Sequence, residues 1–204
     1  MIKLIIIAGP QSSGKTTAFN HLKSKFPDFH YREEINPYLL AGKNHLGGAF
    51  TTRELELKLV EADLLMLKNL NALKLNLYKA IILETSIFHL VYTEKFCGQK
   101  IANNFFEKYL LLQKKFNCLN IFIDTKPEVS FRRRYPTYLK RIKKQNGEIN
   151  SFEFLKRYQK TIYDLYPLWL KWYDRVPFNK LTIRNSFKTK KEFLLEMEEK
   201  LLRF

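Results

Sequence analysis

Two glycines, a lysine and a threonine near the start of the chain have the types and the spacing of a phosphate-binding loop. Gly9 and Gly14 are separated by four residues, and Lys15 and Thr16 follow Gly14 directly. Glycines let the backbone turn tightly, so that successive amide groups point inward at an anion. An ammonium group adds positive charge for the β- and γ-phosphates, and a neighbouring hydroxyl is a ligand for Mg²⁺. The pattern therefore predicts a site for ATP and Mg²⁺.

The residues around this loop predict a strand before it and a helix after it. Residues 3–8 form a continuous apolar run, which is typical of a strand buried on both faces of a parallel sheet. Residues 15–26 place Phe19, Leu22 and Phe26 on one helical stripe. Strand, loop and helix together form the P-loop pattern, in which the helix N-terminus also attracts phosphate. The expected ATP-binding residues are Gly9, Gln11, Ser12, Ser13, Gly14, Lys15, Thr16 and Thr17.

Strand-like and helical segments alternate along the rest of the chain. The further strands are expected at Tyr31 to Ile35, Ala80 to Leu83, Leu119 to Ile123 and Leu181 to Ile183. The further helices are expected at residues 55–73, 101–116, from Pro127 onward, 152–172 and 190–202. Pro136 is expected to interrupt the helix that starts at Pro127. This alternation predicts a single domain over residues 1–204, an α/β three-layer sandwich around a parallel sheet.

Composition excludes several classes of protein. The sequence is 46% hydrophobic and 27% charged, as in ordinary globular domains. No run approaches the ~18 apolar residues of a membrane span, and Ile2 to Ala8 is too short for a signal peptide. Cys97 and Cys118 follow no metal or disulfide spacing, which favours a reducing compartment. We therefore expect a cytoplasmic protein with no membrane contact.

Basic residues are concentrated in the C-terminal part of the chain. Residues 126–204 carry 20 Lys and Arg against 9 Asp and Glu, whereas residues 1–125 carry 16 against 11. The densest stretch, residues 131–144, contains seven Lys and Arg and no acid. Such a cluster either binds phosphate groups, on a nucleotide or a nucleic acid, or forms a solvated helix face.

Three glutamates end strands that should lie beside the loop. Glu33 and Glu34 end the expected second strand, and Glu84 ends the third. A carboxylate at the second strand can accept the proton of an attacking hydroxyl. Neighbouring residues of a strand face opposite ways, so at most one of Glu33 and Glu34 should face the cleft, and the sequence leaves open which. Glu84 is a candidate, with Thr16, for organising Mg²⁺ or for positioning the acceptor.

Other classes of P-loop protein carry motifs that this sequence lacks. A GTPase usually has an Asn-Lys-x-Asp motif, whereas here Asn179-Lys180 is followed by Leu181 and Thr182. An AAA+ machine has an apolar strand that ends in Asp-Glu, and none occurs. Because P-loops serve many reactions, the acidic residues are what favour a kinase.

The order of these features resembles the deoxynucleoside kinase and thymidylate kinase group. Glu34 is followed closely by Asn36-Pro37-Tyr38-Leu39, the third strand has an acidic end, and Pro127-Glu128-Val129 leads into the basic helix. The likeness extends as far as the fifth strand. It implies a P-loop NTPase fold of the nucleoside and nucleotide kinase type, with a five-stranded parallel sheet of order 2-3-1-4-5 and an arginine-rich lid.

The resemblance also implies roles for individual residues. In deoxynucleoside kinases the strand-two glutamate is the general base on the sugar 5′-hydroxyl. Glu34 matches this position best, and Glu33 is the alternative. The lid corresponds to approximately residues 131–150. Its arginines are Arg132, Arg133, Arg134 and Arg141, of which Arg133, with Lys15, is expected to act in catalysis.

Two features of the group are absent here. Deoxynucleoside kinases usually have acid-Arg-Ser after strand three, whereas this chain has Glu84-Thr85-Ser86 and lacks the acceptor-side arginine. Thymidylate kinases have Arg-Glu-Pro-Gly after strand two, whereas Arg32-Glu33 is followed here by Glu34. The acceptor therefore stays open between a nucleoside and a nucleoside monophosphate.

The expected function is transfer of the γ-phosphate of ATP to such an acceptor, mostly by positioning and charge neutralisation. One alternative is a nucleic-acid-end kinase whose C-terminal aromatic residues stack on bases. It is less favoured because Phe154, Tyr158 and Trp169 fall on one helical stripe, which is typical of a core. The other is a nucleotide-binding regulatory NTPase with little turnover. The oligomeric state, a homodimer included, is also open.

Overall fold

The core of the protein is a five-stranded, all-parallel sheet. A computed structural model describes residues 2–41, 46–70, 78–144 and 150–204. The strands are β1 (Lys3–Ala8), β2 (His30–Arg32), β3 (Ala80–Glu84), β4 (Asn117–Asp124) and β5 (Asn179–Arg184). Their order in the sheet is β2-β3-β1-β4-β5, which confirms the predicted topology.

Strand β1 lies in the centre of the sheet and pairs with a strand on each side. Ile5 pairs with Ile82 of β3 and with Leu119 of β4. Because helices cover both faces, a central parallel strand must be apolar on both, and residues 4–8 are all buried. The chain leaves β1 at the point where the strand order reverses direction, which is where parallel α/β sheets bind ligands. The ends of β1, β2 and β3 therefore meet at one edge.

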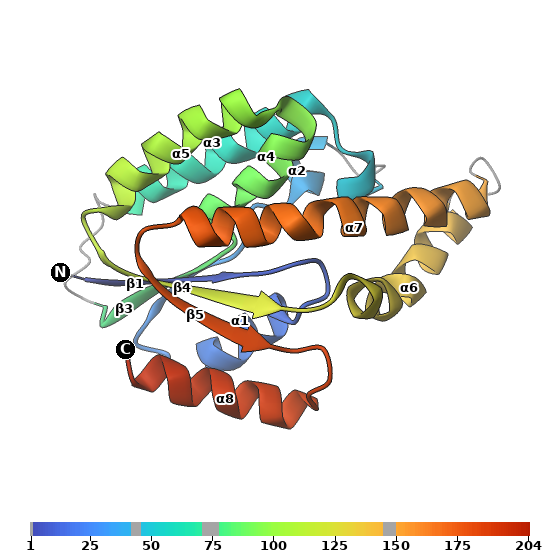
Figure 1. Cartoon of the computed structure of the whole chain (residues 1–204). Coiled ribbons are helices and arrows are strands. Elements are labelled where there is room, and N and C mark those ends of the chain that lie inside the picture. Colours follow the sequence, from blue (N-terminus) through green and yellow to red (C-terminus); the bar gives the residue numbers. More distant parts are fainter. Residues whose placement is uncertain (1, 42–45, 71–77, 145–149) are drawn as a thin grey trace.

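The helices form the two outer layers (Figure 1). One layer consists of α3 (Arg53–Leu70), α4 (Leu90–Cys97), α5 (Gln99–Gln113) and α7 (Ser151–Arg175). These helices pack on Leu4, Ile6 and Ala8 of β1. The other layer consists of α1 (Lys15–Lys25) and α8 (Lys190–Leu202), which pack on Ile5 and Ile7. The alternation of β1 side chains between two cores follows from the two-residue period of a strand.

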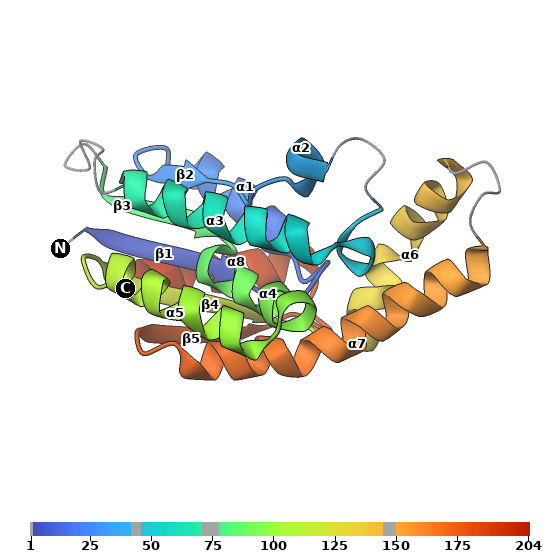
Figure 2. The same cartoon turned by 90° about the horizontal axis from the view of Figure 1, so that it is seen from above.

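Helix α6 (Pro127–Lys144) and the start of α7 project together beyond the carboxyl end of the sheet (Figure 2). They share a small third core in which Tyr138 stacks on Tyr158, and Tyr158 packs on Phe154. The prediction that Pro136 interrupts α6 is wrong, because the helix continues through it. A proline removes one backbone hydrogen bond but has a helical φ, so packing on its flanks can keep the helix intact. Here the buried Tyr138 supplies that packing.

Several shorter elements differ from the prediction. Strand β2 ends at Arg32, so Glu33 and Glu34 follow the strand. The region expected as a loop contains α2 (Pro37–Ala41) and the 3-10 helix η1 (Gly48–Phe50), and residues 42–45 lie outside the described chain. The 3-10 helix η3 (Ser86–His89) and α4 had not been predicted. The helix predicted over residues 55–73 is α3, and residues 71–73 lie outside the described chain. Among the described helices, none has the length and apolar character to cross a bilayer.

Candidate active site

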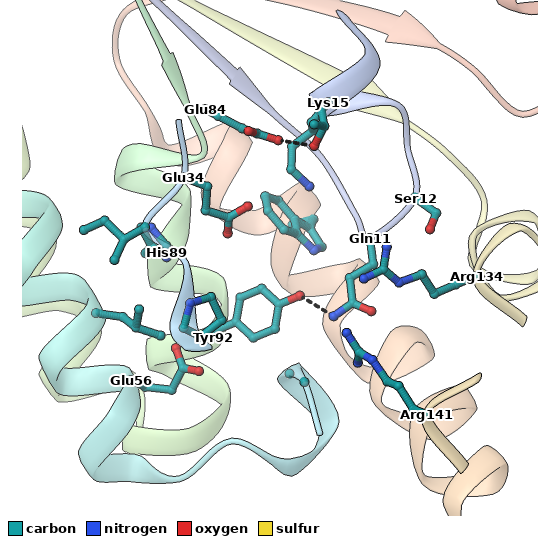
Figure 3. Close-up of a pocket in the computed structure, with 17 residues that line it drawn as sticks. Gln11, Ser12, Lys15, Glu34, Glu56, Glu84, His89, Tyr92, Arg134 and Arg141 are labelled. Atoms are coloured by element: carbon teal, nitrogen blue, oxygen red, sulfur yellow. Dashed lines mark hydrogen bonds between the residues drawn. The ribbon is translucent and has the colours of Figure 1, made fainter. Parts of the chain in front are cut away.

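A cavity of about 260 Å³ opens at the carboxyl edge of the sheet, between the P-loop and helix α6 (Figure 3). Its walls come from the loop after β1, the segment after β2, the end of β3, the 3-10 helices η1 and η3, and helices α3, α4, α6 and α7. The lining residues that carry polar groups are Gln11, Ser12, Lys15, Thr16, Glu34, Glu56, Glu84, His89, Tyr92, Arg134, Arg141 and Trp169.

The P-loop has the backbone shape that its glycines predict. Gly9 has φ 152° and Gly14 has φ 106°, and a Cβ on Gly9 would lie 2.5 Å from the carbonyl oxygen of Ile123. A side chain at Gly9 would therefore collide with backbone. The Lys15 ammonium donates to the carbonyl oxygens of Gly9 at 2.8 Å and of Pro10 at 3.2 Å. The lysine thus lies along the loop at the side of the cavity.

Four further hydrogen bonds hold the loop in place. The Asn185 side chain, just after β5, donates to the backbone oxygen of Ser13 at 2.7 Å. Gln11 donates to the Tyr92 hydroxyl at 3.2 Å and accepts from the Tyr138 hydroxyl at 3.3 Å. The Ser130 hydroxyl donates to the backbone oxygen of Gln11. The loop is therefore hydrogen-bonded to β5, α4 and α6 at once.

Thr16 and Glu84, the two residues predicted for a metal, are brought together. The Thr16 hydroxyl donates to Oε1 of Glu84 at 2.8 Å. Burial raises the pKa of Glu84, and the positive charge of Lys15 opposes that shift. The pair therefore presents oxygen ligands beside the phosphate-binding lysine.

The turn after Glu84 has strained backbone. Thr85 has φ 70° and ψ −67°, and Ser86 has φ 42°. A positive φ is costly for a β-branched residue, about 1–3 kcal/mol at such sites. The Thr85 amide donates to the carbonyl oxygen of Ile7 at 2.9 Å, which holds the turn against β1. The threonine that stands where the group usually has arginine is buried in this turn.

The two adjacent glutamates after β2 face different ways. Glu34 lines the cavity, where its charge raises the pKa of both Glu84 and Glu56. The Glu33 side chain is 68% exposed and lies 3.8 Å from the ammonium of Lys23 on α1. The structure therefore places Glu34, and not Glu33, where an acceptor could meet it.

The four arginines of the expected lid divide between two faces of α6. Arg134 and Arg141 line the cavity, whereas Arg132 and Arg133 are exposed outside it. Seven residues are close to two helical turns, so Arg134 and Arg141 share a face that Arg133 cannot share. The Arg134 Nε is buried without a hydrogen-bond partner among the described residues. The catalytic role expected of Arg133 therefore fits its neighbour Arg134 better, because Arg134 lines the cavity.

The remaining lid arginine is tied to the opposite wall. Arg141 donates to the Leu46 carbonyl oxygen at 2.6 Å and to the Tyr158 hydroxyl at 2.6 Å. The positive charge of Arg141 is therefore fixed across the cavity from Glu34 (Figure 3). The proposed lid range extends to residue 150, and residues 145–149 lie outside the described chain.

Sequence reasoning missed a group of lining residues on α3, η3 and α4. Glu56 and His89 are each 4% exposed, and Tyr92 of α4 lines the cavity beside them. The available signal was a charge inside an apolar stripe, because Glu56 lies between Leu55 and Leu59 on the buried side of α3. Thr17, which had been expected to bind ATP, is exposed and lies outside the cavity.

The fold and the site together define a P-loop kinase. Residues 5–203 match the deoxynucleoside kinase family, and the chain belongs to that family. It is therefore a phosphotransferase that uses ATP to phosphorylate a nucleoside.

Comparison with solved structures gives the same fold. Two similar structures are of deoxyadenosine kinase from M. mycoides, each with a TM-score of 0.55 and 16% sequence identity. Each comparison covers 98% of this chain and 100% of the other. One of those structures has the products dCMP and a flexible dCDP bound, and the other has dCTP bound. No curated protein sequence matches the chain.

Proposed function

We propose that the protein transfers the γ-phosphate of ATP to the 5′-hydroxyl of a deoxynucleoside, with Glu34 as the general base. The proposal is supported most by the separation of charge in the cavity. Lys15, Arg134 and Arg141 lie on the side of the P-loop and α6, whereas Glu34 and Glu56 lie on the other side, and Glu84 lies beside Lys15 at the end of β3 (Figure 3).

That separation favours an uncharged acceptor over a monophosphate. An incoming phosphate group would have to sit among carboxylates, where like charges repel. A hydroxyl meets no such barrier, and Glu34 can accept its proton as the new bond forms. The M. mycoides deoxyadenosine kinase, whose bound products include dCMP, gives a precedent within the same fold.

Most of the catalytic effect would come from the way the chain's own residues position ATP and the acceptor. The P-loop amides and Lys15 bind the phosphates, and Arg134 neutralises charge that shifts toward the leaving group. Arg134 also covers the phosphates from α6, which helps to exclude water as a competing acceptor.

The donor set at Thr16 and Glu84 suits Mg²⁺. This ion is bound through one or two carboxylates with substrate phosphates and water, and an all-protein cage is unusual. Among the described residues, no group of three or more His, Cys, Asp or Glu side chains is arranged to hold a metal ion by itself. When bound, Mg²⁺ would neutralise phosphate charge and hold ATP in register with the loop.

The two alternative functions are less well supported. A nucleic-acid-end kinase would need exposed aromatic residues for stacking. Of the six candidates in the basic C-terminal part, Tyr135 and Tyr163 are exposed, whereas Tyr138, Tyr158, Trp169 and Trp172 are buried in the cores. A regulatory NTPase would not need a carboxylate such as Glu34 in the cavity.

A coupled assay of ADP release tests the proposal. It compares deoxynucleosides with their monophosphates as acceptors, at equal concentration. We expect acceptor-dependent ADP release with deoxynucleosides and at least tenfold less with the monophosphates. Release that needs a monophosphate, or that no acceptor stimulates, would contradict the proposal. The same preparation of the Lys15→Ala variant shows how much activity comes from contaminating kinases.

A further inference from the structure

Helix α6 carries basic side chains that phosphoryl transfer does not use. Arg134 and Arg141 line the cavity, and Tyr138 is buried in the third core. Arg132 and Arg133, by contrast, are exposed and lie outside the cavity. The helix belongs to the arm that projects beyond the sheet (Figure 2). The proposed function therefore leaves a large part of the charge of this arm unexplained.

The exposed cations of α6 form one continuous face. An α-helix has 3.6 residues per turn, so side chains eleven residues apart, such as those of Arg132 and Lys143, point in nearly the same direction. Arg133 and Lys140 are seven residues apart and share the neighbouring stripe. All four side chains are exposed. Together they form the outer basic face, on the side of the helix opposite to Arg134.

No nearby acid offsets the charge of the outer basic face. Glu128, in the first turn, is the only acid of α6. Within the described chain, none of the four basic side chains forms an ion pair, whereas Lys95, Lys160 and Lys171 of helices α4 and α7 each pair with an acid. Like charges this close repel one another, so the face has a positive potential that a polyanion would neutralise.

The outer basic face has the length and the supports to follow a nucleic-acid strand. Eleven residues of helix span about 16 Å, which corresponds to about five nucleotides at a rise of ~3.4 Å each. Tyr135 lies at the edge of the face, where its side chain is 40% exposed and its ring contacts Phe131 edge-on at 6.0 Å. Proteins that bind single strands combine a row of cations with aromatic rings on which bases stack.

A membrane surface fits the outer basic face less well. Helices that lie on a bilayer bury a large apolar face in it. The apolar side of α6 is already used within the protein, because Phe131, Tyr138 and Ile142 pack in the third core. Its exposed side offers Tyr135 and Leu139 as large apolar contacts. The charge of this face therefore favours a hydrophilic polyanion over a lipid surface.

We propose that the outer basic face binds single-stranded nucleic acid, with its four cations on the phosphates and Tyr135 stacked on a base. The strand is a bound partner and not the acceptor of phosphate, because the face lies outside the cavity. The inference does not depend on the proposed function, since it involves no residue of the P-loop and no residue that lines the cavity.

Fluorescence anisotropy with a labelled 12-nucleotide oligodeoxythymidylate tests the inference on the full chain. We expect a Kd of about 1–100 μM at 0.1 M salt, the range of sequence-independent binding. Four phosphate contacts to a single strand predict a slope of about −3 for the logarithm of the association constant against that of the salt concentration. A slope near zero, or no binding at low salt, would overturn the inference. Binding to vesicles rich in phosphatidylserine without binding to the oligonucleotide would also overturn it.

A charge-matched pair of variants then locates the binding. Lys140→Glu/Lys143→Glu reverses two charges of the outer basic face. Lys190→Glu/Lys191→Glu makes the same change in net charge on exposed side chains of α8. We expect the first variant to weaken binding by about tenfold or more and to halve the salt slope, because two phosphate contacts are lost. The second variant should stay within threefold of wild type.

Equal losses in the two variants would mean that total charge alone holds the strand, which contradicts the inference. Thermal unfolding should be close to wild type in both, because the four substituted lysines are exposed. Should the glutamates disturb folding, Lys140→Ala/Lys143→Ala and Lys190→Ala/Lys191→Ala give the same comparison with a residue that favours helix.

Discussion

The hydroxyl of Thr16 donates to the carboxylate of Glu84 at 2.8 Å, which joins the first turn of α1 to the end of β3. The two residues are 68 positions apart in the sequence, and only the parallel pairing of β1 with β3 brings them together. The neighbouring side chain on the loop is Lys15, so the hydroxyl, the carboxylate and the ammonium surround one small region. That region is where the phosphates of ATP and Mg²⁺ are proposed to bind.

Removing the hydroxyl of Thr16 should impair catalysis much more than removing the hydroxyl of Thr17. Thr16→Val keeps the shape but loses the oxygen, so we expect kcat to fall about 10²-fold, in line with the loss of one preorganised electrostatic contact. The Mg²⁺ concentration for half-maximal rate should also rise. Thr17→Val is the control, because Thr17 lies outside the cavity. Steady-state rates over a Mg²⁺ titration measure both effects. Similar rates for the two variants would argue against a metal site at Thr16.

Glu34 should be needed for transfer to a hydroxyl. Glu34→Gln keeps size and one acceptor oxygen but cannot take up a proton at neutral pH, so turnover should fall by about 10²–10⁴. ATP affinity should barely change. Glu33→Gln is expected to stay near the wild-type rate, because Glu33 is exposed and paired with Lys23. Single-turnover rates and ATP binding are the measurements. If Glu33→Gln were the inactive variant, the orientation of this segment would be wrong.

The two faces of α6 give a third test. Arg134→Ala removes a guanidinium from the cavity, and we expect a loss of about 10² in kcat/KM for ATP. Arg133→Ala removes an exposed guanidinium one residue away and should stay within threefold of wild type. Comparable losses in both variants would indicate that the helix turns or shifts when nucleotide binds.

Much of the framework could be predicted because its causes are local in the sequence. The apolar run of residues 3–8, the glycines of the loop and the helical stripe after it all require the same strand–loop–helix unit. The helix at Lys190–Leu202 was predicted to the residue, and in the structure Thr189 and Glu192 form a capping box at its start. The Phe154, Tyr158 and Trp169 stripe was also confirmed as core.

What could not be predicted depends on how elements pack. The β2 strand ends before Glu33, so strand alternation could not decide which glutamate faces inward. Glu56 and His89 belong to separate elements that meet only in the folded protein. Pro136 looked like a break because its local cost is visible in the sequence, while the packing of Tyr138 on Tyr158 is not.

An ion pair remote from the site should give a measurable pH dependence of stability. Asp164 accepts hydrogen bonds from Lys160 at 2.7 Å and Lys95 at 2.6 Å, and these contacts lower its pKa in the folded state. Its contribution is therefore present above the unfolded-state pKa and is lost as the pH falls through the folded-state value. Asp164→Asn should lower the free energy of unfolding at pH 7 by about 0.5–1 kcal/mol.

Urea denaturation at pH 7 and at pH 3 tests this sign. The difference between wild type and Asp164→Asn should shrink at the lower pH, where the wild-type carboxylate begins to be protonated. Asp174→Asn is the control, because Asp174 is exposed on the same helix and has no ion pair within the described chain. A difference that grows on acidification would contradict the assignment.

The most direct test of the account follows the γ-phosphorus of ATP. The protein is incubated with γ-labelled ATP and a mixture of deoxynucleosides, and the labelled products are separated. We predict that the label appears in a deoxynucleoside 5′-monophosphate, and that Lys15→Ala lowers its rate of formation by about 10²–10³ while the fold is retained. Label that appears only as inorganic phosphate, or transfer by Lys15→Ala within tenfold of wild type, would contradict the identification of this cavity as the site of a nucleoside kinase.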